Sequence, residues 1–98
     1  MLFHVTFTVR DSFSLSEIPV VQNRIGETIQ KVLKTGKVKA SGTFLSDRKG
    51  FFLIESDSAE ELLSLFVLLY DVAKPDIQPV VSFDLLPKIF EELQKLPT

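Results

Sequence analysis

The first nine residues, MLFHVTFTV (Met1–Val9), alternate between two kinds of side chain, and this pattern decides the fold class. The core-type positions are Phe3, Val5, Phe7 and Val9, and the positions between them are Leu2, His4, Thr6 and Thr8. Successive residues of a β-strand point to opposite faces of its sheet. The stretch therefore predicts a strand with one core face and one mixed face, and the only histidine, His4, lies on the mixed face.

The composition indicates one small domain that associates with itself. A chain of 98 residues is expected to form a single domain over residues 1–98. Apolar residues make up 45% of it, nine of them Phe, which is more than one small core needs. Homo-oligomerisation is the usual way to cover such a surplus, so we expect a homodimer or a higher homo-oligomer.

Charge and cysteine content exclude several classes of function. The net charge is −2, which gives no reason to expect nucleic acid or a membrane surface as a partner. The chain has no cysteine and one histidine, so it can form neither a disulfide nor a structural zinc site. We expect neither a metal nor an organic cofactor. No apolar run approaches the roughly 20 residues that span a bilayer, and a cytoplasmic protein is predicted.

The rest of the chain alternates between helix and strand patterns. A helix is expected from Ser14 or Ser16, which are rival caps, to a stop at Gly36, and Gly26 within it suggests a close helix–sheet approach. Strands are predicted over 38–45 and 51–55, a second helix from Ser58, and a fourth strand over 77–83. Asp84 is expected to cap a final helix with the apolar residues Leu86, Ile89, Phe90, Leu93 and Leu96.

This order, β-α-β-β-α-β with an added C-terminal helix, predicts the split β-α-β arrangement of the ferredoxin-like α+β folds. Right-handed crossovers give an antiparallel sheet of order 4-1-3-2 with both main helices on one face. The other face is then open. The residues expected on it are His4, Thr6, Thr8, Lys39, Ser41, Thr43, Phe51, Leu53, Glu55, Gln78, Val80 and Ser82.

We expect function on this open face, where polar and apolar groups are mixed. Covering its apolar part with the sheet of a second copy would leave a lined cavity between the two sheets. Such a cavity would bind a small organic molecule. Candidate ligand-binding residues are Thr6, Arg24, Ser41, Phe51, Leu53 and Ser82, of which Arg24 would reach the cavity mouth from the first helix.

A catalytic hypothesis centres on His4. Antiparallel pairing would bring Glu55 and Ser82 beside His4, and a nearby Glu55 would raise the pKa of the histidine, suiting it to acid/base chemistry. A register slip of two residues would separate the trio. The alternative interpretation is a half-buried strand histidine among ordinary polar neighbours.

Several short segments resemble muconolactone isomerase: Met1–Val5, Gly36–Lys37, Phe52–Ser56, Glu61–Leu62 and Asp76–Ile77. The resemblance covers about residues 1 to 80. It implies a ferredoxin-like fold whose subunits pair sheet to sheet as dimeric α+β barrels, and a cofactor-free isomerase activity. His4 matches the opening of that family, and Arg24 matches its first helix.

The chain departs from this family where chemistry would matter. Val21, Gly26 and Thr28 replace charged residues of the first helix, Val38 replaces an aromatic residue, and a helix replaces the short tail. The fold and the sheet-to-sheet dimer therefore carry over more safely than the activity. A non-catalytic interaction or regulatory module is the alternative function.

A second resemblance concerns RNA. Lys49–Ile54 is similar to the third-strand motif of RNA-recognition domains, which stack bases on open-face aromatic rings. Here Leu53 takes a stacking position, and His4 and Thr6 stand where the first strand would offer an aromatic residue. We expect no binding of nucleic acid.

Overall fold

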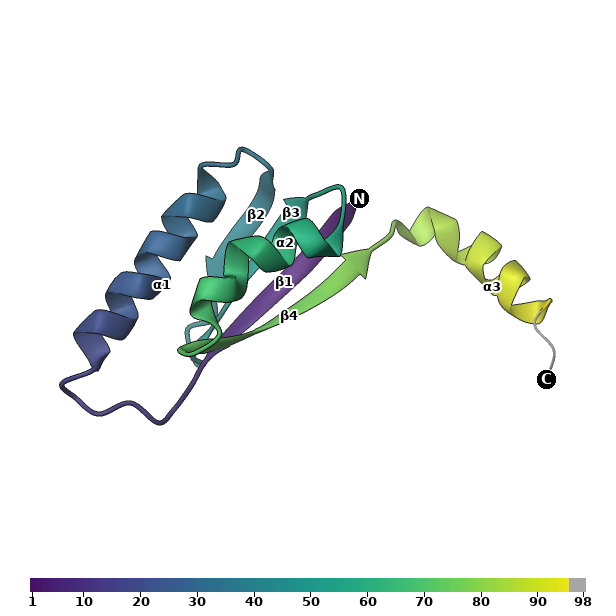
Figure 1. The fold of residues 1–98 in the computed structure, drawn as a ribbon. Coiled ribbons are helices and arrows are strands. Elements are labelled where there is room, and N and C mark those ends of the chain that lie inside the picture. The colour runs from purple at the N-terminus through teal and green to yellow at the C-terminus, as the bar shows by residue number, and fades with distance from the viewer. Residues whose placement is uncertain (96–98) are drawn as a thin grey trace.

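The computed structural model describes residues 1–95, apart from the side chain of Leu68. Its elements follow the predicted order, as Figure 1 shows. They are β1 (Leu2–Val9), α1 (Ile18–Leu33), β2 (Val38–Thr43), β3 (Lys49–Glu55), α2 (Ala59–Phe66), η1 (Val67–Leu69), β4 (Ala73–Val80), η2 (Phe83–Leu85) and α3 (Leu86–Gln94). The predicted β-α-β-β-α-β order with a C-terminal helix is confirmed.

The four strands form one sheet in the order β2-β3-β1-β4, and every neighbouring pair is antiparallel. This is the predicted order. Helices α1 and α2 lie over the same face of the sheet (Figure 1). The sheet therefore has a covered face, which meets the helices, and an open face, which does not.

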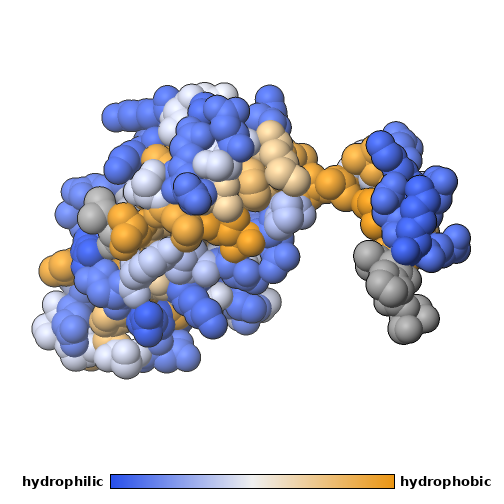
Figure 2. All heavy atoms as spheres, turned by 45° about the vertical axis from the view of Figure 1, so that its right-hand side comes forward, coloured by the Kyte–Doolittle hydropathy of each residue, from blue (hydrophilic) through white to orange (hydrophobic). Residues whose placement is uncertain are grey.

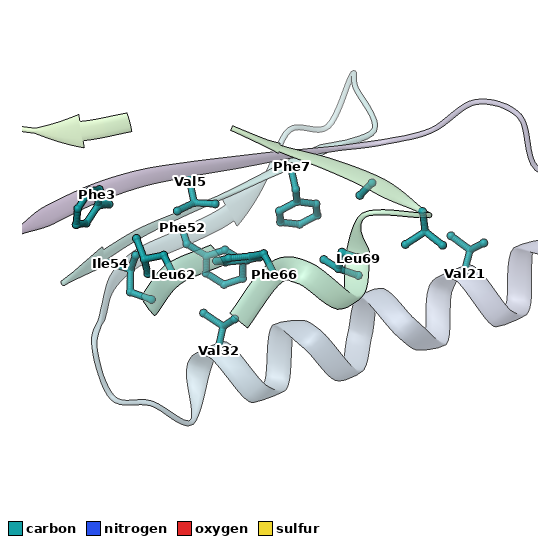
Figure 3. Close-up of a cluster of buried hydrophobic side chains, with 12 residues drawn as sticks. Phe3, Val5, Phe7, Val21, Val32, Phe52, Ile54, Leu62, Phe66 and Leu69 are labelled. Atoms are coloured by element: carbon teal, nitrogen blue, oxygen red, sulfur yellow. The ribbon is translucent and has the colours of Figure 1, made fainter. Parts of the chain in front are cut away.

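The core lies between the covered face and the two helices. Phe3, Val5 and Phe7 of β1 are 0–7% exposed, which confirms the alternation of the first strand. The aromatic ring of Phe52 packs on two others of the cluster that Figure 3 shows, with ring centroids 5.9 Å from Phe7 and 5.7 Å from Phe66. Burying an apolar side chain of this size contributes about 1.5–3 kcal/mol, so these contacts dominate the stability of the fold.

Local hydrogen bonds determine where the helices begin and end. The Ser14 hydroxyl donates to Glu17 Oε1 at 2.7 Å, so the Ser14–Glu17 pairing exists, although α1 itself begins at Ile18. Gly36 has φ = +73° after α1, in the left-handed region that suits glycine, as expected of a helix stop. At α2 the Glu61 N–H donates to Ser58 Oγ at 3.1 Å, which is the predicted cap.

Two expectations about the chain between α1 and β4 are wrong. A Cβ atom at Gly26 would meet nothing within 4 Å, so this glycine marks no close helix–sheet approach. The fourth strand spans Ala73–Val80 rather than 77–83. Pro75 and Pro79 lie inside it, which an edge strand tolerates because the missing N–H groups can face away from the neighbouring strand.

The C-terminal arm, residues 81–95, projects from the body (Figure 1). Ser82 Oγ accepts a hydrogen bond from the Asp84 N–H at 3.2 Å and so caps η2. The cap of the final helix that was expected of Asp84 is wrong, because Leu85 precedes α3 and no side chain caps it. Phe83 is 86% exposed and Phe90 is 56% exposed, and the apolar stretch between the body and α3 is visible in Figure 2. The radius of gyration is 16.5 Å, against about 13 Å for a compact domain of this length. Leu96 lies outside the described residues.

Candidate functional site

His4 lies at the centre of the open face. It pairs with Leu53 on β3 and with Gln78 on β4, and its ring stacks on Phe51 with centroids 5.8 Å apart. Thr6 pairs with Phe51, so Thr6, Phe51, Leu53 and His4 share this face, as predicted. All four are half-buried in the single chain.

The structure does not bring Glu55 and Ser82 to His4. Glu55 pairs with Leu2, and its Oε1 accepts a hydrogen bond from the Met1 ammonium at 2.6 Å. This bond lowers the pKa of Glu55. Ser82 lies two residues beyond the end of β4, where its hydroxyl caps η2. Ser82 lies away from His4 because β4 begins and ends earlier than its sequence pattern suggests, so that Ser82 is outside the sheet.

Ser41 lies on the covered face, which corrects the prediction that placed Lys39, Ser41 and Thr43 on the open face. An irregularity between Val38 and Ala40 takes Lys39 out of the regular pairing and shifts the alternation of β2 by one residue. Ser41 therefore pairs with the buried Phe52, and Thr43 pairs with Gly50. Ala40 and Gly42 take their places on the open face, opposite Leu53 and Phe51.

Arg24 is half-buried on α1 and forms an ion pair with Asp71, which follows η1. The Arg24 guanidinium lowers the pKa of the Asp71 carboxyl, mainly by this hydrogen bond. The pair joins α1 to the turn before β4. Arg24 thus belongs to the helical side of the molecule, away from the open face on which the ligand cavity was expected.

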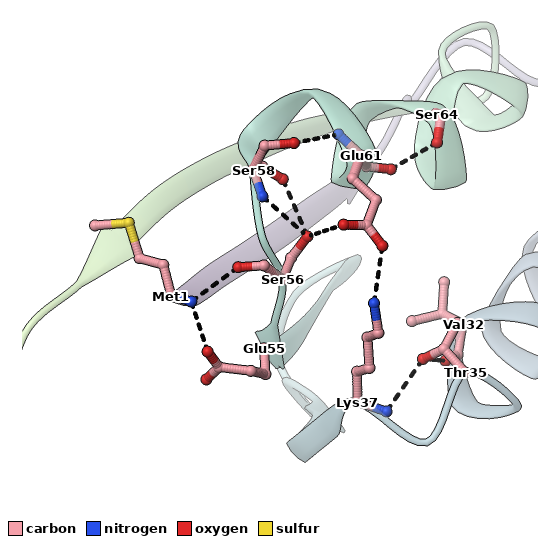
Figure 4. Close-up of polar contacts among 9 residues, drawn as sticks. All are labelled: Met1, Val32, Thr35, Lys37, Glu55, Ser56, Ser58, Glu61 and Ser64. Atoms are coloured by element: carbon pink, nitrogen blue, oxygen red, sulfur yellow. Dashed lines mark hydrogen bonds and ion pairs between the residues drawn. The ribbon is translucent and has the colours of Figure 1, made fainter.

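A polar network lies where β3 ends and α2 begins (Figure 4). Ser56 is buried, and its Oγ lies 3.0 Å from both the Ser58 carbonyl oxygen and Glu61 Oε2. Lys37 Nζ donates to Glu61 Oε1 at 2.9 Å, and this bond is the main reason why the pKa of Glu61 is lowered. The network ties the start of β2 to the start of α2, so its role is structural. Sequence reasoning identified the Ser58–Glu61 cap but had no signal for its partner Lys37.

A cavity of about 660 Å³ opens between α1 and the sheet, at the end of β1 where the chain leaves for α1. Its walls are mostly apolar and include Phe7, Phe13, Val21, Ile25, Ile29 and Phe52. Ser41 and Phe51 are the predicted ligand-binding residues that line it. Sequence reasoning missed this cavity, because Val21, Ile25 and Ile29 form an ordinary apolar helix stripe that would fit a filled core equally well.

The polar residues that line the cavity are exposed and form its rim. Arg10, Arg48 and Lys49 bring positive charge, and Asp11 brings the negative charge. Arg48 Nη1 lies 3.3 Å from Asp11 Oδ1, and Arg10 Nη2 donates to the Tyr70 carbonyl oxygen at 2.9 Å. Apolar walls with a few polar groups at the edge are typical of sites for small organic molecules.

Within residues 1–95, no three His, Cys, Asp or Glu side chains are grouped so that they could hold a metal ion. No helix in the same range is both long and apolar enough to cross a membrane.

Comparison with known proteins identifies the fold. No protein-family model and no curated protein matches the chain. Among solved structures, muconolactone isomerase is similar with a TM-score of 0.62 and 16% identity, over 84% of this chain and 90% of its own. The 5-chloro-2-hydroxyhydroquinone dehydrochlorinase TftG from Burkholderia phenoliruptrix AC1100, in complex with 2,5-dihydroxybenzoquinone, has a TM-score of 0.56 and 16% identity, over 86% of this chain and 97% of its own.

An antibiotic biosynthesis monooxygenase is also similar, with a TM-score of 0.51 and 13% identity, over 84% of this chain and all of its own. These neighbours share one α+β fold. At such low identities the likeness concerns the fold alone. The chain has the ferredoxin-like α+β fold that they share, and the predicted resemblance to muconolactone isomerase is confirmed at that level.

Proposed function

We propose that the chain binds a small organic molecule in the cavity between α1 and the sheet. The observation that carries the proposal is the cavity itself, about 660 Å³ with mostly apolar walls. Sites for small ligands typically have about 300–1,000 Å³ and comparable walls. The structure of TftG with 2,5-dihydroxybenzoquinone supports this proposal, because it shows a protein of the same fold with a small cyclic compound bound.

A titration with N-phenyl-1-naphthylamine, a neutral apolar fluorophore, tests the binding proposal. We expect saturable binding that Ile25→Trp abolishes, because Ile25 lines the cavity and the larger side chain would fill it. The matched control is Val20→Trp, on a side chain of α1 that is 63% exposed. Absence of binding to the unaltered protein, or equal binding to both variants, would contradict the proposal.

The second part of the proposal is a homo-oligomer in which open faces meet. Its support is the half-buried, partly apolar surface around Leu53 and Val80, which the two helices leave uncovered. Light scattering after gel filtration measures the mass in solution. We expect more than one subunit, and Leu53→Asp should reduce the mass to one subunit, whereas Leu63→Asp, on the exposed side of α2, should not. A monomeric unaltered protein would refute this part.

A separate proposal concerns the opposite face of the sheet: acid/base isomerase chemistry at His4, facing the space between two paired sheets and apart from the cavity beside α1. The likeness in fold to muconolactone isomerase and the central position of His4 on the open face support it. Turnover of muconolactone by the unaltered protein, lost in His4→Gln, is the expected result. If the unaltered protein shows no turnover, or if His4→Gln is fully active, His4 has no such role.

A specific observation favours a second candidate function, a non-catalytic assembly module. The apolar surface continues from Val80 on the open face through Val81 and Phe83 into α3, where Phe90 and Leu93 are more than half exposed. A second copy of the chain would cover it. Phe90→Glu should then lower the mass in solution, with Lys88→Glu on the same helix as control. An unchanged mass in Phe90→Glu would argue against this function.

A further inference from the structure

We infer that the ligand of the cavity is an amphipathic organic anion, whose apolar body lies between α1 and the sheet and whose acidic group lies at Arg48. This inference rests on the proposed function, because it names the chemical class of the molecule that the same cavity would bind. It depends on the distribution of charge around the rim.

The rim is positive although the chain is negative. Arg10, Arg48 and Lys49 line the cavity, and Asp11 is the acidic residue among its lining residues. The chain as a whole carries a net charge of −2. Three cations against one carboxylate leave an excess of positive charge at the rim. Such an excess beside apolar walls attracts anions, since the walls screen the field less than water does.

Arg48 is the best placed of these cations. Its backbone carbonyl oxygen accepts the Val9 N–H at 2.8 Å, which holds the connection between β2 and β3 against the end of β1. Its side chain pairs with Asp11 at 3.3 Å, and these side chains are 66% and 93% exposed. An exposed pair of this kind contributes little to stability. Arginine has five N–H donors, so the guanidinium can bind a ligand acid while it keeps or exchanges Asp11.

The walls indicate the kind of body that the anion would carry. Phe7, Phe13 and Phe52 line the cavity together with aliphatic side chains of α1, whereas the ring of Phe51 stacks on His4 on the open face. Aromatic rings pack well against other rings in offset or edge-to-face contacts. A ring-bearing organic acid therefore suits both the walls and the rim.

Two fluorophores that share one ring skeleton test the charge requirement. N-Phenyl-1-naphthylamine is neutral, and 8-anilinonaphthalene-1-sulfonate carries one sulfonate on the same rings. We expect the sulfonate to bind more tightly at low salt and to lose that advantage as salt screens the rim charges. In the double variant Arg48→Gln/Lys49→Gln, the sulfonate should bind about three- to tenfold more weakly, as expected for partly exposed charges, and binding of the neutral probe should stay the same.

Controls separate the charge inference from the binding proposal. Lys39→Gln removes one exposed cation of β2 that does not line the cavity, and it should change neither probe. Ile25→Trp should remove binding of both probes, and sulfonate binding that survives it would mean a different site and overturn the inference. Equal affinity of the two probes, or an equal loss of both in the double variant, would overturn the anion inference and leave the proposed function intact. Failure of both probes to bind would overturn both.

Discussion

The two faces of the sheet use the same strands for different purposes. On the covered face, Val5 and Ile54 are fully buried, and each lies among rings and aliphatic side chains of the core. On the open face, one residue away along the same strands, His4 and Leu53 are only half-buried. The alternation of a strand thus separates residues that hold the fold from residues that are available for recognition.

The neighbouring residues Phe52 and Phe51 give the largest expected difference between the faces. Phe52→Ala should lower the free energy of unfolding by about 3–5 kcal/mol, since it removes a buried ring and leaves a void. Phe52 is 2% exposed and packs on Phe7 and Phe66. Phe51→Ala, on the open face, should cost clearly less in a single subunit. Urea unfolding of both variants measures this, and equal losses would remove the distinction between the faces.

Two glycines, one on each face of the sheet, differ in the space that is available for an added methyl group. A Cβ atom at Gly50, on the covered face, would lie 2.4 Å from Phe7 Cζ, whereas one at Gly42, on the open face, would lie 3.0 Å from Phe51 Cε1. Gly50→Ala should therefore destabilise the protein by about 1–3 kcal/mol, as overpacking of a core does. Gly42→Ala should have a smaller effect because Phe51 can move toward solvent. Thermal unfolding compares them, and a larger loss in Gly42→Ala would reverse the argument.

The outward side of α1, at Gly26, differs from both faces of the sheet because it packs against no other element. A methyl group at Gly26 would meet no atom within 4 Å. Gly26→Ala should therefore stabilise the protein, by up to about 1 kcal/mol, because alanine has the higher helix propensity. A higher midpoint of urea unfolding is the expected result. Destabilisation would show that this side of α1 makes contacts after all.

The smallest effect is expected at the polar network beside the core. Lys37 and Ser56 lower the pKa of Glu61, so the charged form of Glu61 stabilises the fold above the usual pKa of glutamate. This contribution is lost as the pH falls through the lowered pKa. Between about pH 6 and pH 3 the melting temperature of the unaltered protein should fall more steeply than that of Glu61→Gln.

Glu60→Gln is the matched control for that measurement. Glu60 lies beside Glu61 on α2 and takes part in no ion pair among the described residues. Its substitution should leave the slope of melting temperature against pH unchanged. The same slope in Glu61→Gln and in the unaltered protein would mean that the network adds no stability that depends on pH.

Local patterns in the sequence were sufficient to predict the strand order and the covered face. The alternation of Met1–Val9 and the cap at Ser58 depend on neighbours within a few residues, and both were predicted correctly. The predicted start of β4 was wrong. A proline such as Pro75 breaks an internal strand, and it is tolerated here because β4 lies at the edge of the sheet. Whether a strand lies at an edge depends on the whole sheet.

The candidate site was less predictable for the same reason. The placement of His4, Thr6, Phe51 and Leu53 on one face follows from alternation and is confirmed by their pairing. Ser41 changed face because of an irregularity of one residue in β2, and Ser82 left the sheet because β4 ends at Val80. A strand irregularity or a strand end that moves by one or two residues costs little free energy locally, so the amino-acid pattern hardly predicts it.

The sequence by itself determined which residues avoid water and with what period they recur, and hence a ferredoxin-like sheet with one face covered by helices. Only the tertiary structure decided where α1 leaves a cavity over the sheet, and that Arg48 of one hairpin meets Asp11 of a distant loop at its rim. The physical reason is that burial patterns act over a few neighbouring residues, whereas a void and its charged rim arise from elements that are far apart in the chain.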